Sequence, residues 1–148
     1  MTLHELLALF SSKNIEYTTA HLDAVDQNAQ LTDVASDSRE VTPGSLFVCK
    51  GASFSPAYLT SAVETGAVAY LCQQSIAEDL QVVAPNVAAI CVDDVRLAMA
   101  YAAAGVADHP DKKLTTIGIT GTKGKSTCSY MLRAILDGDE PYSKCGVI

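Results

Sequence analysis

The chain has 148 residues, of which 49% are hydrophobic and 18% are charged, and its formal net charge is -7. This hydrophobic content can fill a core, and the charged fraction is too low for a disordered chain. The length allows one or two compact domains. Because an acidic protein is repelled by nucleic-acid phosphates and by anionic lipids, the composition argues against non-specific binding to nucleic acid or to a membrane surface.

The basic residues are concentrated in one part of the chain. Residues 112–136 contain five basic residues and no acidic one, whereas residues 1–111 contain four basic and fourteen acidic residues. An anionic ligand is attracted to a local excess of positive charge. We therefore expect an anion site, if there is one, within residues 112–136.

Five cysteines are spread along the chain without a Cys-x-x-Cys pair, namely Cys49, Cys72, Cys91, Cys128 and Cys145. Cys72 and Cys91 lie in apolar, strand-like runs, where a cysteine usually behaves as a small hydrophobic residue. The odd count and the lack of a basic, signal-like start favour a reducing, cytoplasmic location. No apolar run approaches the roughly 20 residues that a membrane span needs.

The first third of the chain predicts one helix and two short strands. Thr2 and Glu5 are spaced as a capping box, and leucines on one face favour a helix from residue 3 to about residue 12. A polar stretch to about residue 30 follows this helix. We expect a strand over residues 31–36 and, after a Pro-Gly turn, another over residues 46–49.

Helices and strands alternate in the next part of the chain. We expect a helix that begins at Pro56 and stops at Gly66, followed by a strand over residues 67–72. A second cycle of helix and strand begins at about Ile76 and contains a strand over residues 88–92. A helix over residues 95–106, capped by Asp93 or Asp94, follows this strand. This alternation predicts an α/β fold.

Residues 109–113 are predicted to form a linker, because a proline, several charges and a change in the sign of the charge coincide there. We place a domain boundary within it, with one domain over residues 1–111 and a second over residues 112–148. The second is expected to contain a strand over residues 114–119, a glycine-rich turn and a helix over residues 128–136. Residues 144–148 look like a strand that has just begun, so we expect the chain to be a fragment of a longer protein.

The segment from Gly118 to Thr127 reads Gly-Ile-Thr-Gly-Thr-Lys-Gly-Lys-Ser-Thr. Glycines let backbone N–H groups converge on a phosphate, and the helix that follows directs its positive end toward the anion. Lys125 is expected to reach the terminal phosphates, and Ser126 to offer its hydroxyl to Mg²⁺. The first glycine of the general P-loop pattern is replaced by Ile119. The context of strand, glycine turn and helix still favours nucleotide phosphate binding.

A second polar segment begins with Asp37, Ser38 and Arg39. In one interpretation it is a surface turn in which Asp37 and Ser38 cap backbone groups and Arg39 pairs with an acid. In the other it is a loop that hydrogen-bonds a ligand, with Arg39 or Lys50 near an anion. Both interpretations remain open on this segment alone.

Taken together, the two segments resemble the Mur ligases of peptidoglycan synthesis. The resemblance covers essentially the whole chain, and the family's P-loop also lacks the first glycine. It is greatest to the branch that adds the third residue, a diamino acid. The residues that carry it are Asp37-Ser38-Arg39, Val41, Pro43-Gly44, Leu46-Phe47-Val48, Gly51, Ala62, Gly66-Ala67 and the string from Ile117 to Thr127.

The resemblance implies an α/β fold in which an N-terminal domain that binds the UDP-linked substrate is followed by the truncated start of a P-loop ATPase domain. The implied substrate-binding residues are Ser36, Ser38, Ala52, Ser53 and Phe54. The implied ATP-binding residues are Gly121, Thr122, Lys123, Gly124, Lys125, Ser126 and Thr127, with Lys125 also catalytic and Ser126 the ligand of Mg²⁺. Relatives can carry a histidine where this chain has Ala52.

The reaction implied by the resemblance is ATP-dependent amide-bond formation. The terminal carboxylate of UDP-N-acetylmuramoyl-L-alanyl-D-glutamate would attack the γ-phosphate, and the amine of L-lysine or meso-diaminopimelate would displace the resulting acyl phosphate. Lys125 and Mg²⁺ would stabilise the charge on the transferring phosphoryl group. The fragment alone is expected to be inactive, because the family's other functional residues lie further along the chain.

Two alternatives from other classes remain. A different P-loop NTPase or small-molecule kinase would account for the glycine-rich segment but not for the Asp-Ser-Arg segment. A non-catalytic module formed by residues 1–111 would bind a nucleotide sugar without turning it over. A binding experiment that detects uridine nucleotides, ATP or both would discriminate between the ligase and these two alternatives.

Overall fold

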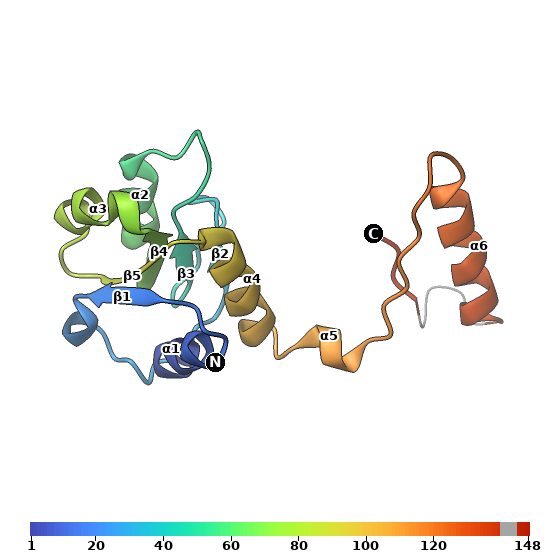
Figure 1. The fold of residues 1–148 in the computed structure, drawn as a ribbon, viewed down its shortest axis with the longest axis horizontal. Helices are drawn as coiled ribbons and strands as arrows, with labels where there is room; N and C mark the ends of the chain where they lie inside the picture. Colours follow the sequence, from blue (N-terminus) through green and yellow to red (C-terminus); the bar gives the residue numbers. More distant parts are fainter. Residues whose placement is uncertain (140–144) are drawn as a thin grey trace. The chain divides into compact units, whose positions relative to one another are not determined.

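The computed structural model describes residues 1–139 and 145–148. It divides the chain into two compact units, Met1–Lys113 and Leu114–Ile148 (Figure 1). Each unit has its own architecture, and the larger one contains the sheet.

The first unit is built around a five-stranded sheet with the order β1-β5-β4-β3-β2. Strands β2 to β5 pair in parallel, and β1 pairs antiparallel with β5. The parallel strands all end at the same edge of the sheet, which we call the carboxyl edge. The strands are β1 (Tyr17–Ala20), β2 (Val34–Ala35), β3 (Leu46–Val48), β4 (Ala69–Gln73) and β5 (Ala88–Val92).

Helices alternate with these strands and confirm the predicted α/β class. They are α1 (Leu3–Ser12), α2 (Pro56–Thr65), α3 (Ala77–Val83), α4 (Val95–Val106) and α5 (Pro110–Lys113), with 3-10 turns η1 (Leu22–Ala24) and η2 (Gln74–Ile76). The expected linker at residues 109–113 therefore contains the short helix α5. In the described part of the chain, no helix combines the length and the apolar character needed to cross a lipid bilayer.

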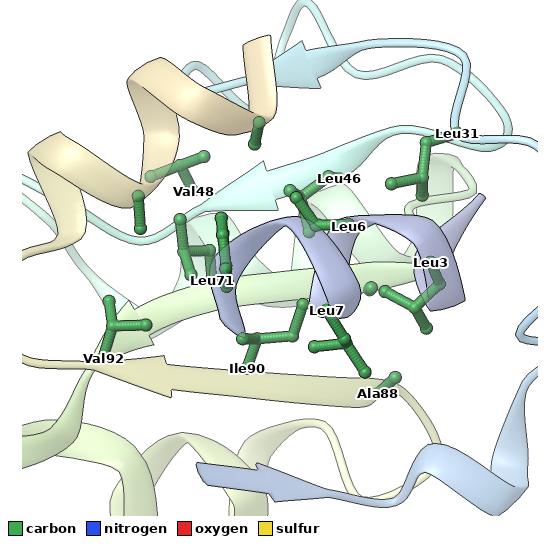
Figure 2. Close-up of a cluster of buried hydrophobic side chains, with 14 of the residues drawn as sticks. Leu3, Leu6, Leu7, Leu31, Leu46, Val48, Leu71, Ala88, Ile90 and Val92 are labelled. Carbon is green, nitrogen blue, oxygen red and sulfur yellow. The ribbon is translucent and has the colours of Figure 1, made fainter. Parts of the chain in front are cut away.

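The sheet is covered on both faces. On one face, the leucines of α1 pack with alternate residues of β3, β4 and β5 (Figure 2). On the other face, α2 and α3 bury Leu59 and Leu80 against the intervening strand residues Phe47 and Tyr70. Because neighbouring strand residues point to opposite faces, strands buried on both sides are apolar throughout. This explains why β4 and β5 were recognisable as continuous apolar runs.

The predicted ends of α1 and α2 are confirmed. Thr2 Oγ1 accepts a hydrogen bond from the Glu5 N–H at 3.1 Å, and a Glu5 carboxylate oxygen accepts one from the Thr2 N–H at 2.8 Å. Helix α2 stops at Gly66, whose φ is +114°. A Cβ at this position would lie 3.0 Å from the Cα of Pro43, so both the conformation and the space favour glycine.

Two expectations about strands in the first unit require correction. The stretch up to residue 30 is not wholly irregular, because it contains β1. This edge strand exposes Thr18 and Thr19 and half-buries only its two end residues, so it has few apolar side chains to reveal it. The strand expected over residues 31–36 is shortened to Val34–Ala35.

The second unit contains the helix α6 (Lys125–Asp137), which begins at Lys125 rather than at Cys128 as expected. The expectation of a strand over residues 114–119 is wrong, since those residues form no regular element. A strand needs a hydrogen-bonding neighbour, and no described residue of this unit provides one. Residues 145–148 likewise form no strand, and Lys144 lies outside the described residues.

Candidate functional site

A pocket of about 430 Å³ lies at the carboxyl edge of β3, β4 and β5. Ligands of open α/β sheets bind at this edge, where the connections after several parallel strands can converge on one molecule. We call it the strand-end pocket. Its walls are Cys49, Lys50, Gly51 and Phe54 after β3, Gln73 and Ile76 at and after the end of β4, and Asp93, Asp94, Val95 and Arg96 after β5.

The walls of the strand-end pocket include an aromatic ring and two basic side chains. Phe54 is half-buried, and its ring meets that of Tyr58 edge-on with the centroids 6.5 Å apart. Lys50 and Arg96 are exposed wall residues. Asp94 Oδ1 accepts a hydrogen bond from the Arg96 N–H at 3.0 Å, so Asp94 caps α4 as predicted. The wall thus offers an apolar surface for a ring and cationic groups for an anion.

The Asp-Ser-Arg segment forms a turn after β2. Asp37 Oδ1 accepts hydrogen bonds from the Arg39 backbone N–H at 3.0 Å and from its Nε at 2.9 Å, and Oδ2 accepts one from Nη2 at 2.5 Å. The side-chain hydrogen bond lowers the pKa of Asp37 to about 2, helped by the backbone bond, and raises the pKa of Arg39. The pairing of Arg39 with an acid and the capping by Asp37 are observed as the first interpretation expects, and the binding of a ligand by this loop stays a prediction.

The five residues expected to contact the substrate follow two neighbouring strands. Ser36 and Ser38 come after β2, with Ser36 exposed and Ser38 half-buried. Ala52, Ser53 and Phe54 come after β3. Phe54 lines the strand-end pocket, whereas the other four lie outside its walls.

Sequence reasoning did not identify Gln73, Ile76, Asp93 and Arg96 as pocket residues. No motif marks them, and Asp93 was considered only as a helix cap. A usable signal was present, because each of them lies at or within a few residues of the end of a predicted parallel strand. Position in the fold, rather than residue type, identifies them.

The glycine-rich loop of the second unit leads into the N-terminus of α6. Gly124 stands at the N-cap with a φ of +77°, and no atom lies within 4 Å of the place that a Cβ would occupy. No side chain caps α6 within the described part of the chain, so its first N–H groups are available to an anion. Lys125 Nζ donates a hydrogen bond to the Gly121 carbonyl at 2.7 Å. This open turn with a lysine folded over it fits a phosphate group.

All residues of the loop that were expected to bind ATP, Gly121 to Thr127, are exposed. Ser126 is in the first turn of α6, where its hydroxyl can face a ligand held by the loop. Within the described ranges, no three His, Cys, Asp or Glu side chains are grouped to hold a metal ion. A cavity of about 520 Å³ in the same unit is lined by residues 114–119, α6 and residues 145–148. The loop residues 121–127 do not line it.

Known proteins similar to this chain share most of its length. A UDP-N-acetylmuramyl-tripeptide synthetase of Latilactobacillus sakei subsp. sakei is 43% identical over 111 residues, which are 75% of this chain and 20% of that protein. The UDP-N-acetylmuramoyl-L-alanyl-D-glutamate--L-lysine ligase of Enterococcus faecalis is 39% identical over 119 residues, or 79% of this chain and 22% of that ligase. No family model matches the chain.

A third relative carries a different amino acid in its name. The UDP-N-acetylmuramoyl-L-alanyl-D-glutamate--2,6-diaminopimelate ligase of Caldanaerobacter subterraneus subsp. tengcongensis is 38% identical over 123 residues, which are 82% of this chain and 24% of that ligase. The chain therefore spans between a fifth and a quarter of the length of these relatives. Over the region that it shares with them, this chain belongs to the Mur ligase family.

Proposed function

We propose that this chain is part of an ATP-dependent ligase of peptidoglycan precursor synthesis that acts in the cytoplasm. The ligase adds a diamino acid, L-lysine or meso-diaminopimelate, to UDP-N-acetylmuramoyl-L-alanyl-D-glutamate. The observation that carries this proposal is the 38–39% identity to two relatives named as ligases for these two amino acids. The strand-end pocket and the glycine-rich loop support it, because they are suited to different parts of such a reaction.

In this proposal, residues 1–111 hold the UDP end of the substrate. The ring of Phe54 at the pocket wall can pack against a nucleobase, since aromatic faces and bases stack favourably. Lys50 and Arg96 are placed on the same walls to balance the charge of a diphosphate. Ser36, Ser38, Ala52 and Ser53 lie on adjoining turns at this edge. Ser36 and Ser38 contact the uridine-diphosphate part, and Ala52 and Ser53 flank the uracil.

The loop from Gly121 to Thr127, at the start of the ATPase domain, holds the phosphates of ATP. Lys125 binds the terminal phosphates, and Ser126 provides a hydroxyl to Mg²⁺. When bound, ATP supplies a phosphoryl group that activates the substrate carboxylate toward an amine. The uncapped N-terminus of α6 and the open turn at Gly124 support this assignment. The chain by itself is inactive in this proposal, since it lacks most of the length of its relatives.

Calorimetry with three ligands tests the proposal. We expect the 148-residue chain to bind UDP and UDP-N-acetylmuramoyl-L-alanyl-D-glutamate, and the Ser38→Ala variant to bind both at least tenfold more weakly. Ser61→Ala is the matched control, because Ser61 is an exposed serine of α2 away from this edge. ATP binding should be weakened by Lys125→Ala and retained by Lys112→Ala, which removes an exposed lysine of the same basic stretch.

The alternatives predict different results in the same experiment. Binding of ATP without any uridine nucleotide would favour an unrelated P-loop NTPase. Binding of the uridine nucleotides without ATP would favour a nucleotide-sugar binding module. In the full-length protein, the incorporation of labelled L-lysine or labelled meso-diaminopimelate into the UDP-linked product identifies the amino acid, and failure with both would contradict the proposed reaction.

A further inference from the structure

Three cysteines form a row across three neighbouring strands of the first unit. Cys72 of β4 and Cys91 of β5 lie directly opposite each other in the parallel pairing. Cys49 directly follows β3, and its N–H donates to the Leu71 carbonyl of β4 at 2.8 Å, which continues the pairing. All three side chains point to the face covered by α2 and α3, and their exposed fractions are 2% or less. We call this arrangement the thiol row.

The two thiols on β4 and β5 are in contact. Cys72 Sγ and Cys91 Sγ are 3.6 Å apart and share a hydrogen bond. Neighbouring strands are about 4.8 Å apart, which lies within the range of Cα separations that a disulfide can bridge, about 4.4–6.8 Å. Since a disulfide bond is about 2 Å long, the two sulfur atoms must approach each other further for one to form.

The members of the thiol row differ in acidity. The hydrogen bond from Cys72 is the main cause that lowers the pKa of Cys91 to about 7, against the opposing effect of burial, and Thr18 and Gln81 lower it further. The same hydrogen bond raises the pKa of Cys72. Burial raises the pKa of Cys49 to about 12. Because the thiolate is the reactive form, Cys91 is the favoured nucleophile and Cys49 remains a thiol.

The thiol row and the strand-end pocket share a residue and are close along the chain. Cys49 is itself a wall residue of the pocket. Gln73 and Asp93 also line the pocket. Gln73 directly follows Cys72 in β4, and Asp93 follows Cys91 of β5 with one residue between them. Cys72 and Cys91 do not line the pocket and are themselves buried, but each is close along its strand to a residue that does line it.

We propose that Cys72 and Cys91 are a redox modification site, which a hydroperoxide converts to a disulfide in the folded protein. In the first step the Cys91 thiolate attacks one peroxide oxygen of H₂O₂, the O–O bond breaks, and proton uptake by the departing hydroxide gives a sulfenic acid and one water. In the second step Cys72 sulfur attacks the sulfenic sulfur, the S–O bond breaks, and the hydroxyl leaves with the thiol proton as a second water. Overall two thiols lose two electrons and two protons, and the peroxide is reduced.

The site is independent of the proposed ligase activity and goes beyond it. Its formation would covalently join β4 to β5. Neighbouring parallel strands leave little freedom for ideal disulfide geometry, and disulfides under strain are readily reduced. The modification is therefore expected to be reversed by small thiols.

Peptide mass spectrometry of the folded 148-residue chain tests the site. The chain is treated with hydrogen peroxide, the remaining thiols are alkylated after unfolding, and the peptides are identified. We expect a linked pair of peptides containing Cys72 and Cys91, lighter by two hydrogen atoms than the separate peptides, while Cys49 is recovered alkylated. Dithiothreitol should remove the link. Recovery of alkylated Cys72 and Cys91 under conditions that oxidise the exposed Cys128 would overturn the proposal.

Two further measurements separate a native-state reaction from one that requires unfolding. The rate of link formation should be unchanged by urea concentrations below the unfolding transition, and a rate that rises in proportion to the unfolded fraction would overturn the proposal. Cys91→Ser should abolish the link, whereas Cys49→Ala, which removes the third thiol of the row, should retain it. Circular dichroism verifies that each variant is folded. The peptide mapping and the urea dependence of the wild-type chain test the proposal even if a variant does not fold.

Discussion

At the scale of single residues, Asp37 and Arg39 show how a turn can be held by one charged pair. Four hydrogen bonds join the Asp37 carboxylate to Arg39, and both side chains are accessible to water. Exposed ion pairs contribute little to stability on average. Their role here is geometric, because they fix the turn on which the proposed substrate residues Ser36 and Ser38 are placed.

This pair predicts a pH dependence of the turn. The pKa of Asp37 is about 2, below its ordinary value of 3.8. A carboxylate whose pKa is lowered by folding stabilises the folded form above the ordinary pKa, and this contribution is lost as the pH falls toward the folded-state pKa. We therefore expect the turn to be intact above about pH 4 and to loosen between about pH 4 and pH 2.

NMR titration of the Asp37 carboxyl carbon measures this directly. Arg39→Ala should raise the pKa of Asp37 part of the way toward its ordinary value, since it removes the side-chain hydrogen bonds and the charge of Arg39 and keeps only the hydrogen bond from the backbone N–H. Arg96→Ala removes another arginine that makes no such contact and should leave the titration unchanged. A pKa that is unchanged in Arg39→Ala would contradict the role of the Arg39 side chain.

Single residues also show why the candidate site was only partly predictable from the sequence. Residues with a local chemical signature, such as Gly124 and Lys125 in the loop, were identified from their order in the sequence. Arg96 and Gln73 carry no such signature, and they become pocket residues only because β4 and β5 lie side by side. Their juxtaposition depends on contacts between distant parts of the chain, which a linear pattern does not contain.

At the scale of elements, helix α1 combines a local signal with tertiary packing. Thr2 and Glu5 exchange two hydrogen bonds at its N-terminus. Leu6 and Phe10 are fully buried in the cluster that α1 forms with the sheet. Figure 2 shows Leu6 in this cluster. Both features were visible in the sequence, and the predicted start and end of the helix are correct for that reason.

The capping box predicts a measurable loss of stability. Thr2→Ala removes the acceptor of the Glu5 N–H and should lower the free energy of unfolding by about 1 kcal/mol, the usual cost of losing such a cap. Urea denaturation followed by circular dichroism measures the change. Thr60→Ala, in the exposed part of α2, is the matched control and should change the stability by less than about 0.5 kcal/mol. Equal losses in the two variants would contradict a specific role for the cap.

Elements that depend on partners were predicted less well than α1. Strand β1 was missed because its pairing with β5 compensates for a weakly apolar sequence. Residues 114–119 show the opposite case, because their apolar run predicts a strand and no described neighbour pairs with it. Leu114 and Ile117 are 68% and 54% exposed there. An apolar run indicates that burial is favourable, but hydrogen bonding to a neighbour decides whether it becomes a strand.

At the scale of the whole molecule, the two units differ in how much of their surface they bury. The buried hydrophobic residues of the described chain all lie between Leu3 and Ala102. In the second unit the one buried side chain among the described residues is that of Asp137, which pairs with Arg133. Helix α6 leaves Tyr130, Met131 and Ile135 more than half exposed. Stability of the chain therefore resides in the first unit.

This difference predicts that the first unit folds without the second. A chain ending at Lys113 keeps both hydrophobic clusters on the two faces of the sheet. Since hydrophobic burial is the main favourable term in folding, we expect its midpoint of thermal unfolding to lie within about 3 °C of that of the 148-residue chain, a shift that corresponds to less than about 1 kcal/mol for a domain of this size.

Differential scanning calorimetry of the two chains measures these midpoints. Leu6→Ala in the shorter chain is the comparison, because it shows how far the midpoint falls when the core itself is damaged. That variant removes a fully buried leucine and should destabilise the unit by about 2–5 kcal/mol. The shorter chain should also bind UDP as the longer one does, because the strand-end pocket is formed entirely by residues 49–96. A large fall in the midpoint on removing residues 114–148 would show instead that the first unit depends on the second for its stability.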